Sequence, residues 1–169
     1  MIILEIIYLL LPCYIANMSP VFAKKLNILK PLAKPINEKW LGKNKTYRGF
    51  VTGIITAIIV VYLQTIFYQP WSLIPYQELN TILLGLLIGF GTLFGDAIES
   101  FFKRRLKIAP GRPFVPFDQL DSVLGALLFI YILHPLSLNI IFFSLIITFI
   151  LTLLSNSIGY LLKIKDVWW

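Results

Sequence analysis

The chain alternates between long apolar stretches and shorter polar connections. The apolar stretches cover about 2–22, 49–68, 79–98, 118–134 and 137–162. A helix needs about 20 residues to cross the hydrocarbon core of a bilayer. The pattern therefore predicts an all-α integral membrane protein with about five transmembrane helices, arranged as a single transmembrane domain over 1–169.

The basic residues lie in the connections and near the C-terminal end. Of the 15 Lys and Arg residues, eight fall between Lys24 and Arg48, five fall between Lys103 and Arg112, and the last two are Lys163 and Lys165. Basic residues near span ends collect on the cytoplasmic side of a membrane. We therefore expect cytoplasmic loops at about 23–48 and 99–117, an outside N-terminus and a cytoplasmic C-terminus. The predicted location is the cell membrane, with several passes and a functional site that faces the cytoplasm.

Composition supports the membrane class and excludes several others. Hydrophobic residues make up 58% of the chain, against about 45–50% in soluble domains, and the mean hydropathy is +0.82. The single cysteine, Cys13, cannot form an internal disulfide, and the single histidine, His134, excludes a multi-histidine metal site. The basic residues of the two predicted cytoplasmic loops account for the formal net charge of +7, and we expect no nucleic-acid partner.

Four carboxylates flank the second basic loop. Asp96 and Glu99 lie at the end of the third apolar stretch, and Asp118 and Asp121 at the start of the fourth. On a helix Asp96 and Glu99 would share one face with Ser100 and Lys103, at spacings i, i+3, i+4 and i+7. Such oxygen donors suit a Mg²⁺ ion that also holds substrate phosphates. The alternative is that these carboxylates are interfacial groups paired with neighbouring basic residues.

The first basic loop offers a second set of polar donors. The segment 42–49 reads Gly-Lys-Asn-Lys-Thr-Tyr-Arg-Gly directly before the second apolar stretch. It is not a Walker loop, because the glycine needed at position 37 is replaced by Asn. Lys45, Thr46 and Arg48 at a helix N-terminus suit phosphate oxygens, and anionic lipid headgroups are the alternative ligand.

Three other features have structural interpretations. The proline-rich segment 110–116 predicts a stiff connector between the acidic helix ends. Glycines at 85, 89, 91 and 95 form two small-xxx-small pairs that predict close helix packing. Asn17 in the first span is expected to hydrogen-bond a neighbouring helix rather than to serve the site.

The motifs together resemble those of a known family. The segment Gly95-Asp96-Ala97-Ile98-Glu99-Ser100-Phe101-Phe102-Lys103-Arg104, followed by Asp118-Gln119-Leu120-Asp121-Ser122, resembles the C-terminal signature of the CTP:phosphatidate cytidylyltransferase family. Asn44-Lys45-Thr46 resembles the family's shorter motif. The loop lacks the histidine-containing stretch of the bacterial enzymes, and Thr46-x-Arg48-Gly49 is similar to the archaeal branch, the CDP-archaeol synthases.

The resemblance implies a CTP-dependent lipid-phosphate cytidylyltransferase. Its reaction would transfer CMP from CTP to 2,3-bis-(O-geranylgeranyl)-sn-glycerol 1-phosphate, giving CDP-2,3-bis-(O-geranylgeranyl)-sn-glycerol and pyrophosphate in archaeal phospholipid biosynthesis. The implied partners are CTP, an isoprenoid ether-lipid phosphate and the bilayer, and the implied cofactor is Mg²⁺.

The resemblance also implies roles for individual residues. The implied catalytic residues are Asp96, Lys103, Asp118 and Asp121. The implied metal ligands are Asp96, Asp118 and Asp121, with Glu99 as a weaker candidate that would instead order Lys103. The implied substrate-binding residues are Lys45, Thr46, Arg48, Ser100 and Arg104, and which of the basic residues hold CTP and which hold the lipid phosphate stays open.

Other functions are also compatible with parts of the pattern. A CDP-diacylglycerol synthase acting on phosphatidic acid would use the same motifs. A CDP-alcohol phosphatidyltransferase would need Asp-Gly where this chain has Asp96-Ala97. A small ion or solute transporter would also carry carboxylates in a membrane, although transporters place them nearer the middle of the bilayer. A homodimer is compatible with the sequence.

Overall fold

The computed structural model describes residues 2–109 and 112–163. Its long helices are α1 (Ile2–Lys25), α3 (Tyr47–Ile66), α4 (Thr81–Arg105), α5 (Phe117–Leu133) and α6 (Leu138–Leu161). A 3-10 turn, Lys30–Leu32, and the short helix α2, Glu38–Leu41, lie between α1 and α3. The expected all-α membrane fold is confirmed, since no strand element is found among the described residues.

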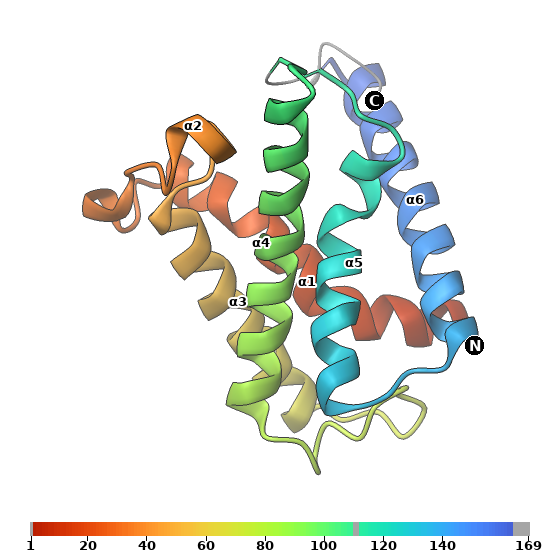
Figure 1. Ribbon diagram of the computed structural model, residues 1–169. Coiled ribbons are helices and arrows are strands. Elements are labelled where there is room, and N and C mark those ends of the chain that lie inside the picture. Colours follow the sequence, from red (N-terminus) through yellow and green to blue (C-terminus); the bar gives the residue numbers. More distant parts are fainter. Residues whose placement is uncertain (1, 110–111, 164–169) are drawn as a thin grey trace.

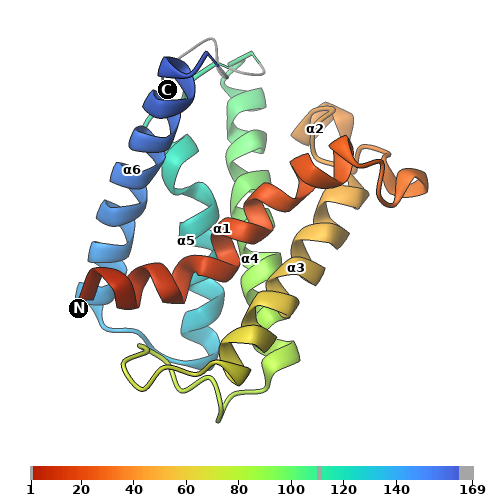
Figure 2. The ribbon, with the colours of Figure 1, turned by 180° about the vertical axis from the view of Figure 1, so that it is seen from behind.

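Helix α4 packs against α1, α2, α3 and α5. Helix α3 packs on one side of α4, while α5 lies on the other side, between α4 and α6 (Figure 1). Helix α1 crosses the others obliquely, and the view from behind shows it running over α5, α4 and α3 (Figure 2). This crossing brings the middle and the C-terminal end of α1 close to the start of α3.

Within the described ranges, four helices, α1, α3, α4 and α6, are long and apolar enough to cross a membrane. Helix α5 has 17 residues, so its length is about 25 Å, slightly short of a hydrocarbon core of about 30 Å. It is nevertheless packed between α4 and α6. A fifth span and the expected orientation stay predictions.

The glycine pairs of α4 face two different neighbours. A β-carbon added at Gly85 would lie 2.5 Å from the α-carbon of Ile58 on α3. One added at Gly89 would lie 2.8 Å from the α-carbon of Ile54 on the same helix. A β-carbon at Gly91 would lie 2.6 Å from the carbonyl oxygen of Gly125 on α5. Backbones therefore approach closely on both sides of α4, as the small-residue spacing predicts.

Helix α4 is longer than the sequence pattern indicates. The helix continues beyond the predicted span 79–98 to Arg105, and the cytoplasmic location of 99–117 stays a prediction. Glu99, Ser100 and Lys103 are all buried in this extension, so these polar groups face the protein instead of the bilayer. Basic residues in the last turn also interact favourably with the helix dipole. The predicted stiff connector 110–116 lies partly outside the described residues, which exclude Pro110 and Gly111.

Candidate active site

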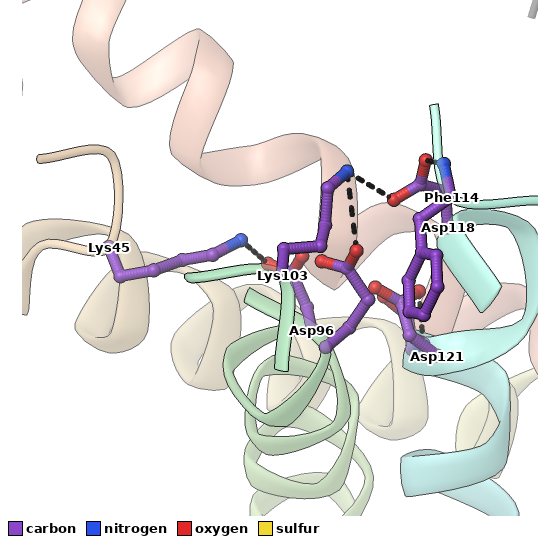
Figure 3. A network of polar contacts seen from close by, with 8 residues as sticks. Lys45, Asp96, Lys103, Phe114, Asp118 and Asp121 are labelled. Atoms are coloured by element: carbon purple, nitrogen blue, oxygen red, sulfur yellow. Dashed lines mark hydrogen bonds and ion pairs between the residues drawn. The ribbon is translucent and has the colours of Figure 1, made fainter. Parts of the chain in front are cut away.

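The start of α3 is held by the chain segment that precedes it. Ile36 N donates to Lys45 O at 2.8 Å and Tyr47 N donates to Lys34 O at 3.1 Å. The side chain of Thr46 caps α3, because its Oγ1 accepts a hydrogen bond from Gly49 N at 3.1 Å. These bonds fix Lys45 immediately before the helix, where its side chain extends towards α4 (Figure 3).

Three carboxylates converge where α4 and α5 meet. Asp96 and Glu99 come from neighbouring turns of α4, and Asp121 comes from the first turns of α5. One oxygen of each lies within 4.8 Å of the others. The Glu99 side chain is buried, and its Oε1 accepts no hydrogen bond from the described residues. This carboxylate group, defined as Asp96, Glu99 and Asp121, has the donors needed to bind a metal ion.

Asp118 is placed differently from the other three carboxylates. Lys103 Nζ donates to Asp118 Oδ1 at 2.6 Å, and Phe114 N donates to Asp118 Oδ2 at 2.6 Å, as Figure 3 shows. The same Lys103 Nζ lies 3.3 Å from Glu99 Oε1. Both Asp118 oxygens are therefore engaged, and the structure joins Glu99, not Asp118, to the predicted ligands Asp96 and Asp121.

A polar pocket of about 230 Å³ opens beside the carboxylate group. Its walls come from residues 41–45, the end of α4 and the start of α5. The predicted substrate-binding residues Lys45, Ser100 and Arg104 all line it. Lys45 forms an ion pair with Asp96, and the Nε of Arg104 is buried without a hydrogen-bond partner among the described residues. Arg48 is buried but is not a lining residue of this pocket.

An apolar pocket of about 590 Å³ adjoins the polar pocket. It lies between α4 and α5 and is lined mainly by phenylalanine and leucine side chains, among them Phe94, Phe102 and Leu124. Glu99 and Asp121 line both this apolar pocket and the polar pocket. The carboxylates therefore stand at the boundary between a charged space and a hydrocarbon-like one.

A third pocket, the α1 pocket, has a volume of about 410 Å³ and lies between α1, the segment before α3, and α4. It shares Asn44, Lys45 and Asp96 with the polar pocket. Thr46 and Asn17 also line it. The expected hydrogen bond from Asn17 to a neighbouring helix is not found among the described residues. Sequence analysis did not place Asn17 in a pocket with Lys45 and Asp96, although a single side-chain amide in an apolar span could have indicated such a position.

Comparisons with known proteins agree with these motifs. The sequence model of the CarS-like family, described as CDP-archaeol synthase, matches residues 1–169. A CDP-archaeol synthase of Methanocaldococcus jannaschii is 35% identical over 170 residues, covering 96% of this chain and 95% of that protein. A CDP-archaeol synthase of Methanococcus aeolicus is 36% identical, covering 95% and 93%. A solved structure described as "Structural insight into an intramembrane enzyme for archaeal membrane lipids biosynthesis" matches with a TM-score of 0.73 and 29% identity, covering 91% of this chain and 94% of that chain.

Proposed function

Because the chain belongs to the CarS-like family of CDP-archaeol synthases, we propose that it is a CTP-dependent cytidylyltransferase of archaeal lipid synthesis. The proposed reaction transfers CMP from CTP to 2,3-bis-(O-geranylgeranyl)-sn-glycerol 1-phosphate and releases pyrophosphate. Family membership makes the protein an enzyme, which removes the transporter alternative. The apolar helices and the intramembrane neighbour make it a multi-pass membrane protein.

One observation carries the proposal. The carboxylate group lies at the boundary of a pocket with cationic side chains and a pocket with apolar walls. A cytidylyltransferase for lipids has to bring a water-soluble polyanion together with the phosphate of an amphiphile. The polar pocket suits the phosphates of CTP, and the apolar pocket suits a hydrocarbon chain entering from the bilayer.

The three converging carboxylates fit a hard divalent cation. Oxygen ligands are those that Mg²⁺ prefers. Among the described residues the buried Glu99 Oε1 accepts no hydrogen bond and has Lys103 Nζ as an ion-pair partner at 3.3 Å. We therefore propose Asp96, Glu99 and Asp121 as the ligands, with Asp118 holding Lys103 in place. A bound Mg²⁺ would neutralise charge on phosphate oxygens.

In the proposed reaction, the protein's side chains position the two substrates and supply positive charge. An oxygen of the lipid phosphate attacks the α-phosphorus of CTP, so a new O–P bond forms. The bond from the α-phosphorus to the bridging oxygen breaks, and pyrophosphate leaves with the electron pair. The attacking oxygen is already anionic near neutral pH, so no strong general base is required. Lys45, Lys103 and Arg104 would reduce the repulsion between the two anions, and Ser100 would donate a hydrogen bond.

The remaining expectations are kept as proposals. Thr46 caps the start of α3. Arg48 does not line the polar pocket, so it would act on a bound ligand indirectly. The site faces the cytoplasm in our proposal because its loops carry most of the basic residues. A homodimer stays a prediction from the sequence.

The test is incorporation of radiolabelled CTP into lipid by the purified protein with Mg²⁺. Geranylgeranyl ether phosphate and a diacyl phosphatidic acid would be compared as acceptors. Labelled product from the ether lipid alone is expected. Equal use of both acceptors would contradict the archaeal specificity, and the absence of product from either would contradict the proposed reaction.

A further inference from the structure

A fourth pocket lies across α1 from the carboxylate group. Its volume is about 550 Å³, and it is formed by α1, α3 and the chain that follows α1. We call residues 26–34 the arm and this cavity the arm pocket. Residues 15, 18, 19 and 22 of α1 line the arm pocket, whereas residues 17, 20, 21 and 24 line the α1 pocket. At 3.6 residues per turn these two sets lie on opposite faces of the helix, so the arm pocket is separated from the carboxylate group by α1 itself.

The walls of the arm pocket offer hydrocarbon contacts, and their hydroxyl groups are already engaged. Ser19 Oγ donates to Ala16 O at 3.0 Å, Thr52 Oγ1 donates to Arg48 O at 2.9 Å, and Thr56 Oγ1 donates to Thr52 O at 2.9 Å. The large apolar side chains that line the pocket and are exposed are Met18, Phe22, Ile28, Leu29 and Ile55. Such a lining suits a hydrocarbon chain better than a polar ligand.

A sharp reversal of the chain after α1 brings the arm to this pocket. Ile28 N donates to Ala23 O at 3.0 Å, a bond typical of a helix C-terminus that ends in a left-handed residue. Asn27 and Leu29 both have positive φ values, 54° and 49°, which residues with side chains seldom adopt. Ala23, Ile28 and Leu29 all line the pocket. The reversal therefore places two apolar residues of the arm against the space between α1 and α3.

Two exposed cations flank the apolar residues of the arm. Lys25 ends α1, a helix long and apolar enough to cross a membrane, and Lys30 begins the 3-10 turn. Neither forms an ion pair among the described residues, and no Asp or Glu occurs between Glu5 and Glu38. Figure 2 shows the arm projecting outwards at the end of α1. Cations at the end of a span lie at the depth of the lipid headgroups, where they attract anionic lipids.

We propose that the arm pocket binds an anionic membrane lipid, with a hydrocarbon chain between α1 and α3 and a phosphate against Lys25 and Lys30. The apolar walls fit the chain, and the two unpaired cations fit the charge of the headgroup. This lipid is a component of the surrounding bilayer and not a substrate, because α1 lies between the pocket and the carboxylate group. The inference does not depend on the proposed reaction.

The arm is joined by hydrogen bonds to the segment that carries Lys45. The 3-10 turn of the arm packs against α3. At the end of the arm, Lys34 O accepts a hydrogen bond from Tyr47 N at 3.1 Å, and Ile36 N donates to Lys45 O at 2.8 Å. A lipid that holds the arm against α1 and α3 should therefore also stabilise the segment that positions Lys45.

The experiment measures the affinity of the detergent-solubilised protein for phosphatidylglycerol and for phosphatidylcholine with the same chains, by native mass spectrometry. The charge variant is Lys25→Gln combined with Lys30→Gln, and its control is Lys39→Gln on the exposed helix α2. The pocket variant is Ile55→Trp, in which the indole fills part of the pocket. Its matched control is Ile59→Trp, one turn further along α3, which is exposed but does not line the arm pocket.

We expect the wild type to bind phosphatidylglycerol about tenfold more tightly than phosphatidylcholine, and the charge variant to lose this preference. Ile55→Trp should weaken the binding of both lipids, and the two controls should behave as the wild type. Phosphatidylglycerol should also raise the thermal midpoint of the wild type more than that of Ile55→Trp.

Three results would overturn the inference. Equal affinity of the wild type for the two lipids would exclude a site selective for anionic lipids. Unchanged phosphatidylglycerol binding in Ile55→Trp would place the lipid elsewhere on the protein. A rise in the KM of the lipid phosphate substrate in Ile55→Trp, with none in Ile59→Trp, would make the arm pocket part of the substrate site.

Discussion

Gly95 of α4 lies directly against the backbone of Asp121 on α5, so that a β-carbon at residue 95 would lie 2.1 Å from the carbonyl oxygen of Asp121. Gly95 immediately precedes Asp96, and both Asp96 and Asp121 belong to the carboxylate group. The close crossing of the two helices is therefore the feature that brings carboxylates from two helices together.

Replacing Gly95 by Ala should separate these helices. In a solvent-exposed helix interior the same change stabilises by about 1 kcal/mol through helix propensity. Here the added methyl group meets backbone that cannot rotate away, and overpacking costs about 1–3 kcal/mol. We expect a lower thermal midpoint in detergent and a loss of most of the turnover. The control is Leu83→Ala at an exposed position of α4, and an unchanged midpoint for Gly95→Ala would contradict the prediction.

Asp118→Asn and Asp121→Asn should differ in their response to Mg²⁺. Asp121 belongs to the carboxylate group, whereas both oxygens of Asp118 are engaged by Lys103 Nζ and Phe114 N. Adding Mg²⁺ should raise the thermal midpoint of the wild type and of Asp118→Asn, but not that of Asp121→Asn. The same loss of the Mg²⁺ effect in both variants would restore Asp118 as a ligand. Glu78→Gln, in an exposed loop, serves as the control.

Lys45→Met should affect Mg²⁺ affinity and turnover in opposite directions. Lys45 forms an ion pair with Asp96, so its ammonium group competes with a cation for that carboxylate. Its removal should increase Mg²⁺ affinity in the absence of nucleotide, by a few-fold for one partly buried charge. Turnover should fall, because a cation that faces the phosphates is lost. Lys39→Met, on the exposed helix α2, should change neither quantity, and a lower Mg²⁺ affinity in Lys45→Met would argue against this competition.

Leu124→Trp should test the apolar pocket as the site of the lipid chain. Leu124 lines that pocket on α5, and the larger indole would fill part of its volume. We expect the KM for the geranylgeranyl ether phosphate to rise about tenfold, equivalent to about 1.4 kcal/mol of lost chain burial. The KM of a short-chain lipid phosphate should change little. Leu83→Trp is the control outside the pocket, and equal KM values for Leu124→Trp and the wild type with the long-chain substrate would place the chain elsewhere.

The sequence alone was sufficient to predict those features that depend on regular spacing along a helix or on the length of a membrane span. Apolar stretches of membrane length predicted the long helices, because crossing a bilayer imposes a minimum run of apolar residues. The spacing of Asp96, Glu99 and Lys103 placed these side chains on one face of a helix, and this is how α4 presents them. The glycine spacing predicted close packing, and the motif residues pointed to the correct family.

Only the tertiary structure decided which groups meet between helices. It joined Glu99 to Asp96 and Asp121 and engaged Asp118 with Lys103, whereas the motif alone treated Glu99 as the weaker ligand. It extended α4 past the predicted end of the span, because buried protein contacts can shelter polar side chains that lipid would reject. It also placed Asn17 beside Lys45 and Asp96. Such contacts depend on how closely two backbones approach and on side-chain orientation, and neither leaves a periodic pattern in the sequence.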